Sequence, residues 1–266
     1  MMELCSIASG SSGNCIFVGG EHTRLLIDTG ISRKRIFSGL EGIDVSPDDL
    51  DGILITHEHA DHISGLGVMA RTLKIPIYGT PGTIRGIKAM NSLGEIDPSL
   101  FCEISADVDF TVGDLTVHPF HISHDANDPV AYRITDGSRT VAVATDMGTY
   151  DAYTVRNLSN VNAMLLEANH DIRMLEVGPY PYQLKRRVAG DYGHLSNEWS
   201  GRLLSSVLHD DLKQVFLGHL SKQNNMAELA YETVKLEVTL DDNPYKGEEI
   251  PIAVASRDEP SQKAVV

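Results

Sequence analysis

The segment "ITHEHADHISG" at residues 55–65 constrains the fold more than any other stretch of the chain. It follows a short apolar run and holds three histidines and two acids within six positions. Alternate residues of an extended strand end face one way, so His57 and His59 can meet one metal ion. Asp61 and His62 follow in the turn and can reach a second ion. A solvated loop needs none of this chemistry, so the segment predicts the first half of a metal site.

Other polar residues of ligand type follow later apolar runs. "HPFHISHDANDP" offers His118, His121 and His124, "VAVATDMG" contains Asp146, and "VFLGHLS" contains His219. Taken singly, each residue is more typical of a satisfied surface or core position than of a ligand. Together with the first motif, they indicate strand ends that point into one shared cleft. Spacing alone does not choose among the three histidines of the first group.

Short β-like runs alternate with Gly-rich turns, and segments of helical periodicity separate them. Ser32 can cap a helix over 33–40 that stops at Gly42, and Asp136-Gly137 marks a hairpin turn. Further helices are expected in 63–74, 196–210 and 227–238. The order of strands then helix, twice, predicts two packed sheets with helices outside. With no evident linker, we expect one domain over 1–266.

Composition excludes some functions and favours a cellular location. The formal net charge of −15 argues against a general basic surface for nucleic acid, so such a substrate would need metals and a local basic patch. Three cysteines without a CxxC spacing fit reduced thiols. No stretch contains 18 consecutive apolar residues, and the first residues do not read as a signal peptide. We therefore expect a cytoplasmic protein that does not enter the membrane; oligomeric state is left open.

Five segments resemble the motifs of the metallo-β-lactamase superfold: "LLIDTG", "THEHADH", "SHDANDPVAY", "ATDMG" and "LGHLS". The resemblance extends over about residues 4–257. "SIASGSSGNC", "LEANHD", "GPYPYQLKRRV", "GHLSN" and "GHLSKQNN" further resemble the YycJ-like (WalJ-like) members, which are related to RNase Z and to nucleases of the superfold. The resemblance implies an α/β (α+β) fold, the four-layer αββα metallo-β-lactamase sandwich.

The same resemblance implies two divalent metal ions per chain and their ligands. One ion would take His57, His59 and His124, the other Asp61, His62 and His219, and Asp146 would bridge them. Asp28 would support the motif loop by hydrogen bonds. Histidine and carboxylate ligands suit zinc, manganese and iron alike, so the sequence does not choose the metal.

The superfold implies hydrolysis by a metal-bridging hydroxide, which Asp61 can also orient, but it does not determine the substrate. No cysteine stands near the fourth or fifth motif, unlike in a typical zinc β-lactamase. The segment between Asp146 and His219 is too short for the inserted domain of RNase J, and the tail is too short for the helical domain of glyoxalase II. A nuclease on DNA, including a 5′-to-3′ exonuclease, or on RNA is therefore expected. The alternatives are a small-molecule phosphodiester, ester or thioester hydrolase, and a non-catalytic regulatory protein.

"GHLSNEWSGRLL" places His194 and Ser196 just before an expected helix. It resembles the RNase Z segment whose histidine holds the scissile phosphate, and free N–H groups at a helix start suit a phosphate. This makes His194 a candidate catalytic residue and Ser196 a candidate substrate contact. Alternatively, Ser196 or Asn197 only caps the helix, and His194 is a solvated loop residue.

Two further segments are candidates for substrate binding. Lys185 and Arg186 in "QLKRR" can form a local basic patch with Arg187, or simply a solvated charged face. Asn169 and His170 end another apolar run and can contact substrate or cap the local backbone.

Overall fold

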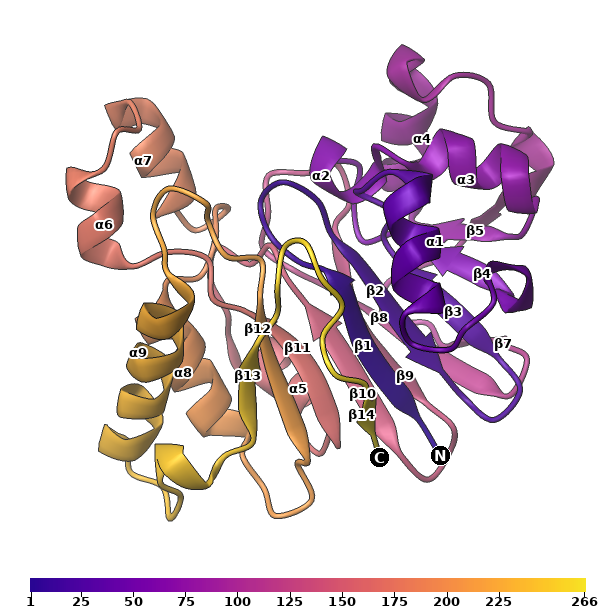
Figure 1. Ribbon diagram of the computed structural model, residues 1–266. Helices are drawn as coiled ribbons and strands as arrows, with labels where there is room; N and C mark the ends of the chain where they lie inside the picture. The colour runs from indigo at the N-terminus through magenta and orange to yellow at the C-terminus, as the bar shows by residue number, and fades with distance from the viewer.

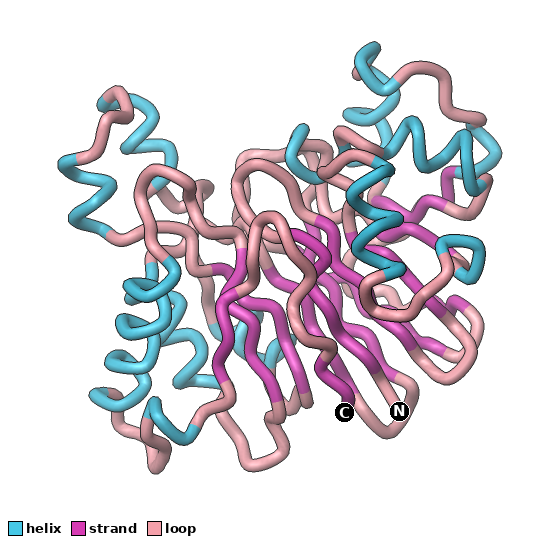
Figure 2. The backbone as a smooth tube through the Cα atoms, in the orientation of Figure 1, coloured by secondary structure: helices cyan, strands magenta, loops and turns pink.

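The computed structural model describes residues 1–266 and contains two seven-stranded sheets (Figures 1 and 2). The strands of the first sheet are, in spatial order, β14 (Ala264–Val265), β1 (Glu3–Ala8), β2 (Cys15–Gly19), β3 (Arg24–Ile27), β4 (Gly52–Leu54), β5 (Ile77–Gly79) and β6 (Phe101–Glu103). Those of the second are β13 (Ile252–Val254), β12 (Gln214–Gly218), β11 (Ala163–Glu167), β10 (Thr140–Ala144), β9 (Val130–Thr135), β8 (Leu115–His121) and β7 (Phe110–Val112).

Each sheet has an antiparallel part and a parallel part. Strands β1 to β3 pair antiparallel, whereas β3 to β6 run parallel. In the second sheet β7 to β10 pair antiparallel, and β10 to β13 run parallel. The parallel strands therefore direct their carboxyl ends to a common edge, where loops can gather side chains.

Helices cover the outer face of each sheet. The first sheet carries α1 (Arg33–Glu41), α2 (Ala60–Ile63), α3 (Leu66–Leu73) and α4 (Pro81–Ala89). The second carries α5 (Ala152–Leu158), α8 (Asn197–Val207) and α9 (Ala227–Leu240). Two short helices, α6 (Ile172–Val177) and α7 (Tyr182–Val188), stand apart from both sheets at the upper left of Figure 1. None of these helices combines the length and apolar character that a membrane crossing requires.

The layers follow from side-chain alternation along buried strands. In β3, Leu25 and Ile27 belong to the core between the sheets, while Leu26 packs under the helices of the first sheet. In β10, Val143 faces the other sheet and Ala142 faces the outer helices. Strands that bury both faces are read in the sequence as near-continuous apolar runs. Besides the core between the sheets, an apolar layer therefore lies between each sheet and its outer helices. The predicted four-layer αββα sandwich is confirmed.

Local predictions were close but not complete. Ser32 caps α1, because its Oγ accepts a hydrogen bond from the Arg35 N–H. Strands β9 and β10 form the hairpin around Asp136-Gly137. The helix expected over 63–74 is instead interrupted after Ile63 and resumes as α3. Gly65 stands at the interruption because a Cβ there would lie 2.2 Å from the carbonyl oxygen of Ile31.

Candidate metal centre

The predicted ligands lie at strand ends along one edge of the sandwich. The "THEHADH" segment follows β4 of the first sheet, and His124, Asp146 and His219 follow β8, β10 and β12 of the second. Both sheets therefore contribute to the same site. The four strand ends belong to segments that are far apart in the sequence, and only the packing of the two sheets brings them together.

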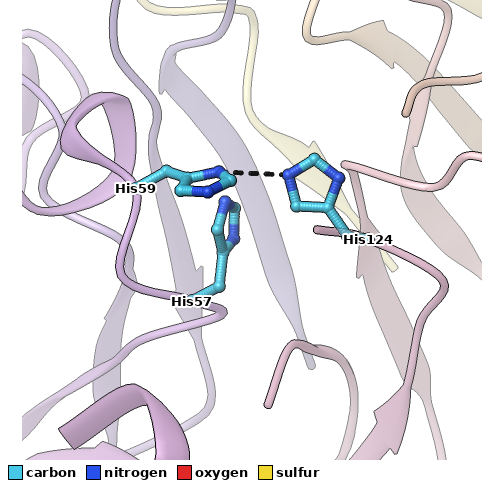
Figure 3. Close-up of side chains that lie close together, drawn as sticks. All are labelled: His57, His59 and His124. Carbon is cyan, nitrogen blue, oxygen red and sulfur yellow. Dashed lines mark hydrogen bonds between the residues drawn. The ribbon is translucent and has the colours of Figure 1, made fainter. Parts of the chain in front are cut away.

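Four groups of side chains place possible ligand atoms within 4.8 Å of one another. Figure 3 shows the first group, in which His59 Nδ1 and His124 Nε2 are 3.1 Å apart. The groups are His57, His59 and His124; Asp61, His62 and His219; His57, His62 and Asp146; and Asp146, Glu167, His194 and His219. The first two contain the residues predicted for the two ions, and Asp146 lies in the two groups beside them. The assignment of individual ligands stays a prediction.

Three buried atoms of these side chains lack a hydrogen-bond partner: His57 Nε2, Asp146 Oδ2 and His219 Nδ1. The last two are 3.0 Å apart but do not have hydrogen-bond geometry. Buried polar atoms without partners cost free energy, and a cation bound among them removes that cost. Imidazole and carboxylate donors in this number suit a divalent metal. The residues therefore fit the metal that the motif predicts.

The protonation of His57, His124 and Asp146 fits metal binding. Burial lowers the pKa of His57 well below its ordinary value and also lowers the pKa of His124, so both rings keep a free lone pair. Burial would raise the pKa of Asp146, but the neighbouring His219 and His62 hold it well below its ordinary value. Neutral imidazoles and an ionised carboxylate are the forms that bind cations. Burial would lower the pKa of His62, but Asp146, Asp28 and Asp61 raise it well above its ordinary value, so an ion that binds His62 has to displace a proton.

Asp28, at the end of β3, fixes the motif loop by hydrogen bonds, as predicted. Its carboxylate accepts from the backbone N–H of Thr56 at 2.9 Å and from the Thr56 hydroxyl at 2.8 Å. Its Oδ2 also lies 2.7 Å from His62 Nδ1. Because Nδ1 is engaged in this contact, the other ring nitrogen of His62, Nε2, faces Asp146 and lies 3.2 Å from its Oδ2. His124 is held similarly, because its Nδ1 lies 3.1 Å from the carbonyl oxygen of Gly193.

Three residues at the site have left-handed backbone, which is uncommon for residues other than glycine. Asp28, Asp146 and His219 have φ values of 61°, 62° and 55°. Each follows a strand end closely, so the turn redirects the chain while the side chain stays at the sheet edge. Such conformations cost free energy and persist only where the surroundings enforce them, as at functional sites.

The glycine-rich loop "SGSSGN" holds the motif from the other side. The Asn14 N–H donates to the carbonyl oxygen of Asp61 at 2.8 Å, and Asn14 Nδ2 lies 3.2 Å from His62 Nε2. The contact is possible because Gly30 has no side chain, since a Cβ there would lie 1.7 Å from the Asp61 carbonyl oxygen. Sequence reasoning used this loop as part of the "SIASGSSGNC" resemblance and missed Asn14, whose partner is 47 positions away.

His194 lies beside the metal groups and is held by a buried acid. Its Nδ1 is 2.8 Å from Glu167 Oε1 and 3.6 Å from Asp146 Oδ1, and its side chain is 18% exposed. Burial alone would lower the pKa of His194, but the charge and hydrogen bond of Glu167 raise it to about 9. Glu167 also accepts from the N–H groups of Met147 and Leu195. Sequence reasoning missed Glu167, although it ends the apolar run of β11 just as Asp146 and His219 follow theirs.

Two of the other predicted substrate contacts, Ser196 and Asn169, have identifiable local partners, whereas the buried Nδ1 of His170 has none. Ser196 caps α8 by accepting from the Trp199 N–H, and Asn169 Nδ2 donates to the carbonyl oxygen of His219 at 2.8 Å. His170 is buried, and this burial lowers its pKa to about 4. These roles agree with the capping alternative for Ser196 and Asn169. Contact of these residues with a substrate stays a prediction.

The site opens into a cleft of about 350 Å³, which we call the metal cleft. It is lined by His59, Asp61, Asp146, Asn169, His194 and His219 and, around α7, by Tyr180, Leu184, Arg187 and Val188. Arg187 therefore reaches the cleft, where its Nη2 lies 3.0 Å from Asp125 Oδ1. Lys185 and Arg186 are not among the lining residues, and Lys185 Nζ donates to the carbonyl oxygen of Glu176. Their role as phosphate contacts stays a prediction.

The sequence profile described as "Beta-lactamase superfamily domain" matches residues 23–208, which contain six of the seven predicted ligands. The chain belongs to the beta-lactamase superfamily. Proteins of this family are metal-dependent hydrolases, and this chain is a hydrolase with a divalent-metal site.

Two relatives show to which part of the superfamily the chain belongs. The chain is 40% identical over 228 residues to the exodeoxyribonuclease WalJ of Streptococcus pneumoniae serotype 2, covering 86% of this chain and 85% of that protein. It is 38% identical over 228 residues to the exodeoxyribonuclease YycJ of Bacillus anthracis, covering 86% of both. The chain is therefore a member of the WalJ/YycJ family.

A solved structure supports the fold at much lower sequence identity. The metallo-beta-lactamase fold protein YhfI of Bacillus subtilis superposes with a TM-score of 0.71 at 18% identity, covering 99% of both chains. At this identity the similarity shows the fold only. The two sheets and their outer helices are thus those of a metallo-β-lactamase fold protein.

Proposed function

We propose that this chain is a DNA exonuclease that works with two divalent metal ions. The observation that carries the proposal is the match over 86% of the chain to two proteins named exodeoxyribonucleases. The complete set of histidine and aspartate groups at the sheet edge supports catalysis rather than a regulatory role that has lost the metal. The three unpaired cysteines fit a cytoplasmic enzyme.

In this proposal, His57, His59 and His124 would hold one ion, Asp61, His62 and His219 would hold the other, and Asp146 would serve both. Zinc, manganese and iron all suit these ligands. Bound ions of this kind supply an activated water at neutral pH and stabilise charge on phosphate oxygens.

The chain's own side chains have separate tasks in the proposed reaction. Asp61 is part of the metal cleft and can orient the attacking water by accepting its hydrogen bond. His194 is protonated at neutral pH because its pKa is raised, and Glu167 occupies its Nδ1. Nε2–H is therefore free to donate to a phosphate oxygen or to the leaving oxygen. Arg187 adds positive charge to the same cleft.

The test is degradation of end-labelled DNA by the purified protein supplied in turn with zinc, manganese and iron. We expect mononucleotides released from the 5′ end of single- or double-stranded DNA, and slower cleavage of RNA of the same sequence. The His194→Ala variant is the matched control for a contaminating nuclease. If no metal supports cleavage of DNA or RNA while the protein hydrolyses a small phosphodiester or ester, the proposal is wrong and the chain is a small-molecule hydrolase.

A further inference from the structure

A second cavity, of about 250 Å³, adjoins the metal cleft, and His194 lines both. We call it the α8 pocket. Its walls come from the chain around α6, from the segment before α8 and from the first turn of α8. The lining residues that matter here are His170, Ile172, Glu176, Asp191, His194 and Trp199.

The charges in the α8 pocket do not suit a phosphate group. No lysine or arginine lines it, and its one cationic side chain, His194, lies at the border with the metal cleft, whereas the acids Glu176 and Asp191 line the α8 pocket alone. Phosphate binding relies on lysine and arginine, and in the metal cleft Arg187 supplies such a cation. His170 adds no positive charge at neutral pH, because burial lowers its pKa to about 4. The pocket therefore fits an uncharged group that presents N–H donors, which carboxylates accept.

An exposed aromatic ring forms part of the same pocket. Trp199 is 48% exposed and Ile172 is 39% exposed, so these two large apolar side chains face solvent at the cavity. The indole is nevertheless fixed, since the Tyr150 ring meets it edge-on at 5.6 Å and the Arg202 guanidinium carbon lies 5.6 Å from its centroid. A rigid exposed indole is a surface on which nucleobases stack.

We propose that the α8 pocket binds the nucleobase of the deoxynucleotide next to the scissile phosphate, with Trp199 as its stacking surface. The proposal rests on the exonuclease function proposed above and adds how the strand is held. A phosphate at the metals and at His194 leaves the adjoining base within reach of the pocket, because His194 belongs to both. Stacking also supplies affinity that a chain of net charge −15 does not obtain from a general basic surface.

Trp199 is the only tryptophan of the chain, so intrinsic fluorescence reports on this pocket directly. The metal-loaded protein is titrated with deoxyguanosine monophosphate and, separately, with deoxyribose 5-phosphate, which lacks a base. We expect saturable quenching by the nucleotide and none by the sugar phosphate, with free N-acetyltryptophanamide correcting for collisional quenching. Absence of saturable quenching by the nucleotide overturns the proposal.

Variants test the stacking itself. Trp199→Ala should weaken binding of a cleavage-resistant single-stranded phosphorothioate oligonucleotide about ten-fold, measured by anisotropy of a label at its far end. Trp199→Phe should retain most of the affinity, and Val177→Ala, exposed on α6 outside the pocket, should bind like the parent. An oligonucleotide with abasic terminal residues should bind the parent and Trp199→Ala equally. Circular dichroism of each variant checks its fold, and equal affinity of folded Trp199→Ala and parent for the normal strand contradicts the proposal.

The nuclease assay separates failure of this inference from failure of the proposed function. If the parent degrades DNA but neither quenching nor the loss in Trp199→Ala is seen, the base pocket is wrong and the exonuclease stands. If the parent degrades no DNA but deoxyguanosine monophosphate quenches saturably, the exonuclease is wrong and the nucleotide pocket is supported. If the parent neither degrades DNA nor shows saturable quenching by the nucleotide, both proposals are wrong.

Discussion

At the scale of single residues, three histidines of the site each have one ring nitrogen in contact with a neighbouring oxygen, so only the other ring nitrogen is available. Asp28 holds His62, the Gly193 carbonyl holds His124, and Glu167 holds His194. Each contact determines which ring nitrogen remains for the site. The consequence is that residues outside the predicted site control the geometry of two predicted ligands, His62 and His124, and of the candidate catalytic residue His194.

Replacing Asp146 by alanine should lower metal occupancy. The variant removes the carboxylate that lies within reach of His62 and His219, so cations at the two sites would repel each other without an anion between them. Metal analysis after dialysis should find fewer than two ions per chain, while Glu259→Gln, exposed in the C-terminal segment, should match the parent. Two tightly held ions in Asp146→Ala would rule out its bridging role.

Replacing His194 by alanine should slow DNA cleavage by about 10²-fold while both ions stay bound, the usual loss for a positioned acid or hydrogen-bond donor. Glu167→Gln preserves the shape but removes the charge that raises the pKa of His194. Its rate should fall by a smaller factor, and its pH–rate profile should shift to lower pH on the basic side. Cleavage by His194→Ala at the parent rate would return His194 to a structural role; loss of a metal would make it a ligand.

The candidate ligands could be selected from the sequence because each stands in a short motif at the end of an apolar run. The residues that hold these side chains in place are far from them in the sequence. The partner of Asn14 is 47 positions away, and that of His194 is 27 positions away, so no local pattern links them. Glu167 could have been found by the rule that selected Asp146, since both come at the end of buried strands.

At the scale of elements, the loops at the sheet edge pack too closely for side chains. The segment from β3 to α1 crosses the motif loop at Gly30, against the backbone of Asp61. The hydrogen bond from Asn14 to the same carbonyl joins a third segment. This close approach holds the start of α2 and the turn of the "THEHADH" segment in place.

Gly30→Ala should therefore destabilise the protein by at least about 1–3 kcal/mol, the usual cost of overpacking, because its Cβ would overlap a backbone oxygen. Urea unfolding of the metal-free proteins measures the difference in free energy of unfolding. Gly42→Ala is the matched control, since its Cβ would meet nothing closer than 3.4 Å and its φ is −65°. Equal stability of Gly30→Ala and the parent would show that the two loops can separate freely.

Helices and strands were predicted correctly where the apolar pattern extends over many residues, and less well where the pattern is short. The helices α8 and α9 and the β9–β10 hairpin follow from apolar spacing and turn residues. The helix expected over 63–74 was wrong in its continuity, because the Ile31 backbone occupies the space beside Gly65. Helices α6 and α7 have fewer than two full turns of pattern each and were not predicted as helices.

At the scale of the whole molecule, the two sheets share one core. A cluster of 20 buried residues draws side chains from both, including Leu4, Ile27, Val143 and Phe216. Tyr132 of β9 also donates its hydroxyl to the carbonyl oxygen of Ile55, just before the metal motif, at 2.7 Å. We infer that residues 1–266 form a single domain, since separating the sheets would expose this core.

Removal of metal should lower the melting temperature of the protein. The predicted ligands come from both sheets, so bound ions join them at the edge that carries the site. An ion that binds only the folded form stabilises it by about 2.7 kcal/mol at a free concentration of 100 times its Kd. Calorimetry before and after chelation measures the shift, and Asp146→Ala should show a smaller shift than the parent. An unchanged melting temperature after complete removal would contradict this coupling.

The distribution of the predicted ligands over two sheets would also determine when the protein can acquire its metal. While the chain is being synthesised, the "THEHADH" segment appears early, but the predicted ligand His219 follows only after twelve of the fourteen strands. An ion captured by the early histidines alone would have an incomplete and flexible set of ligands. The protein would therefore select among competing metals only after folding, when buried acids and backbone carbonyls have already set the orientations of the histidine rings.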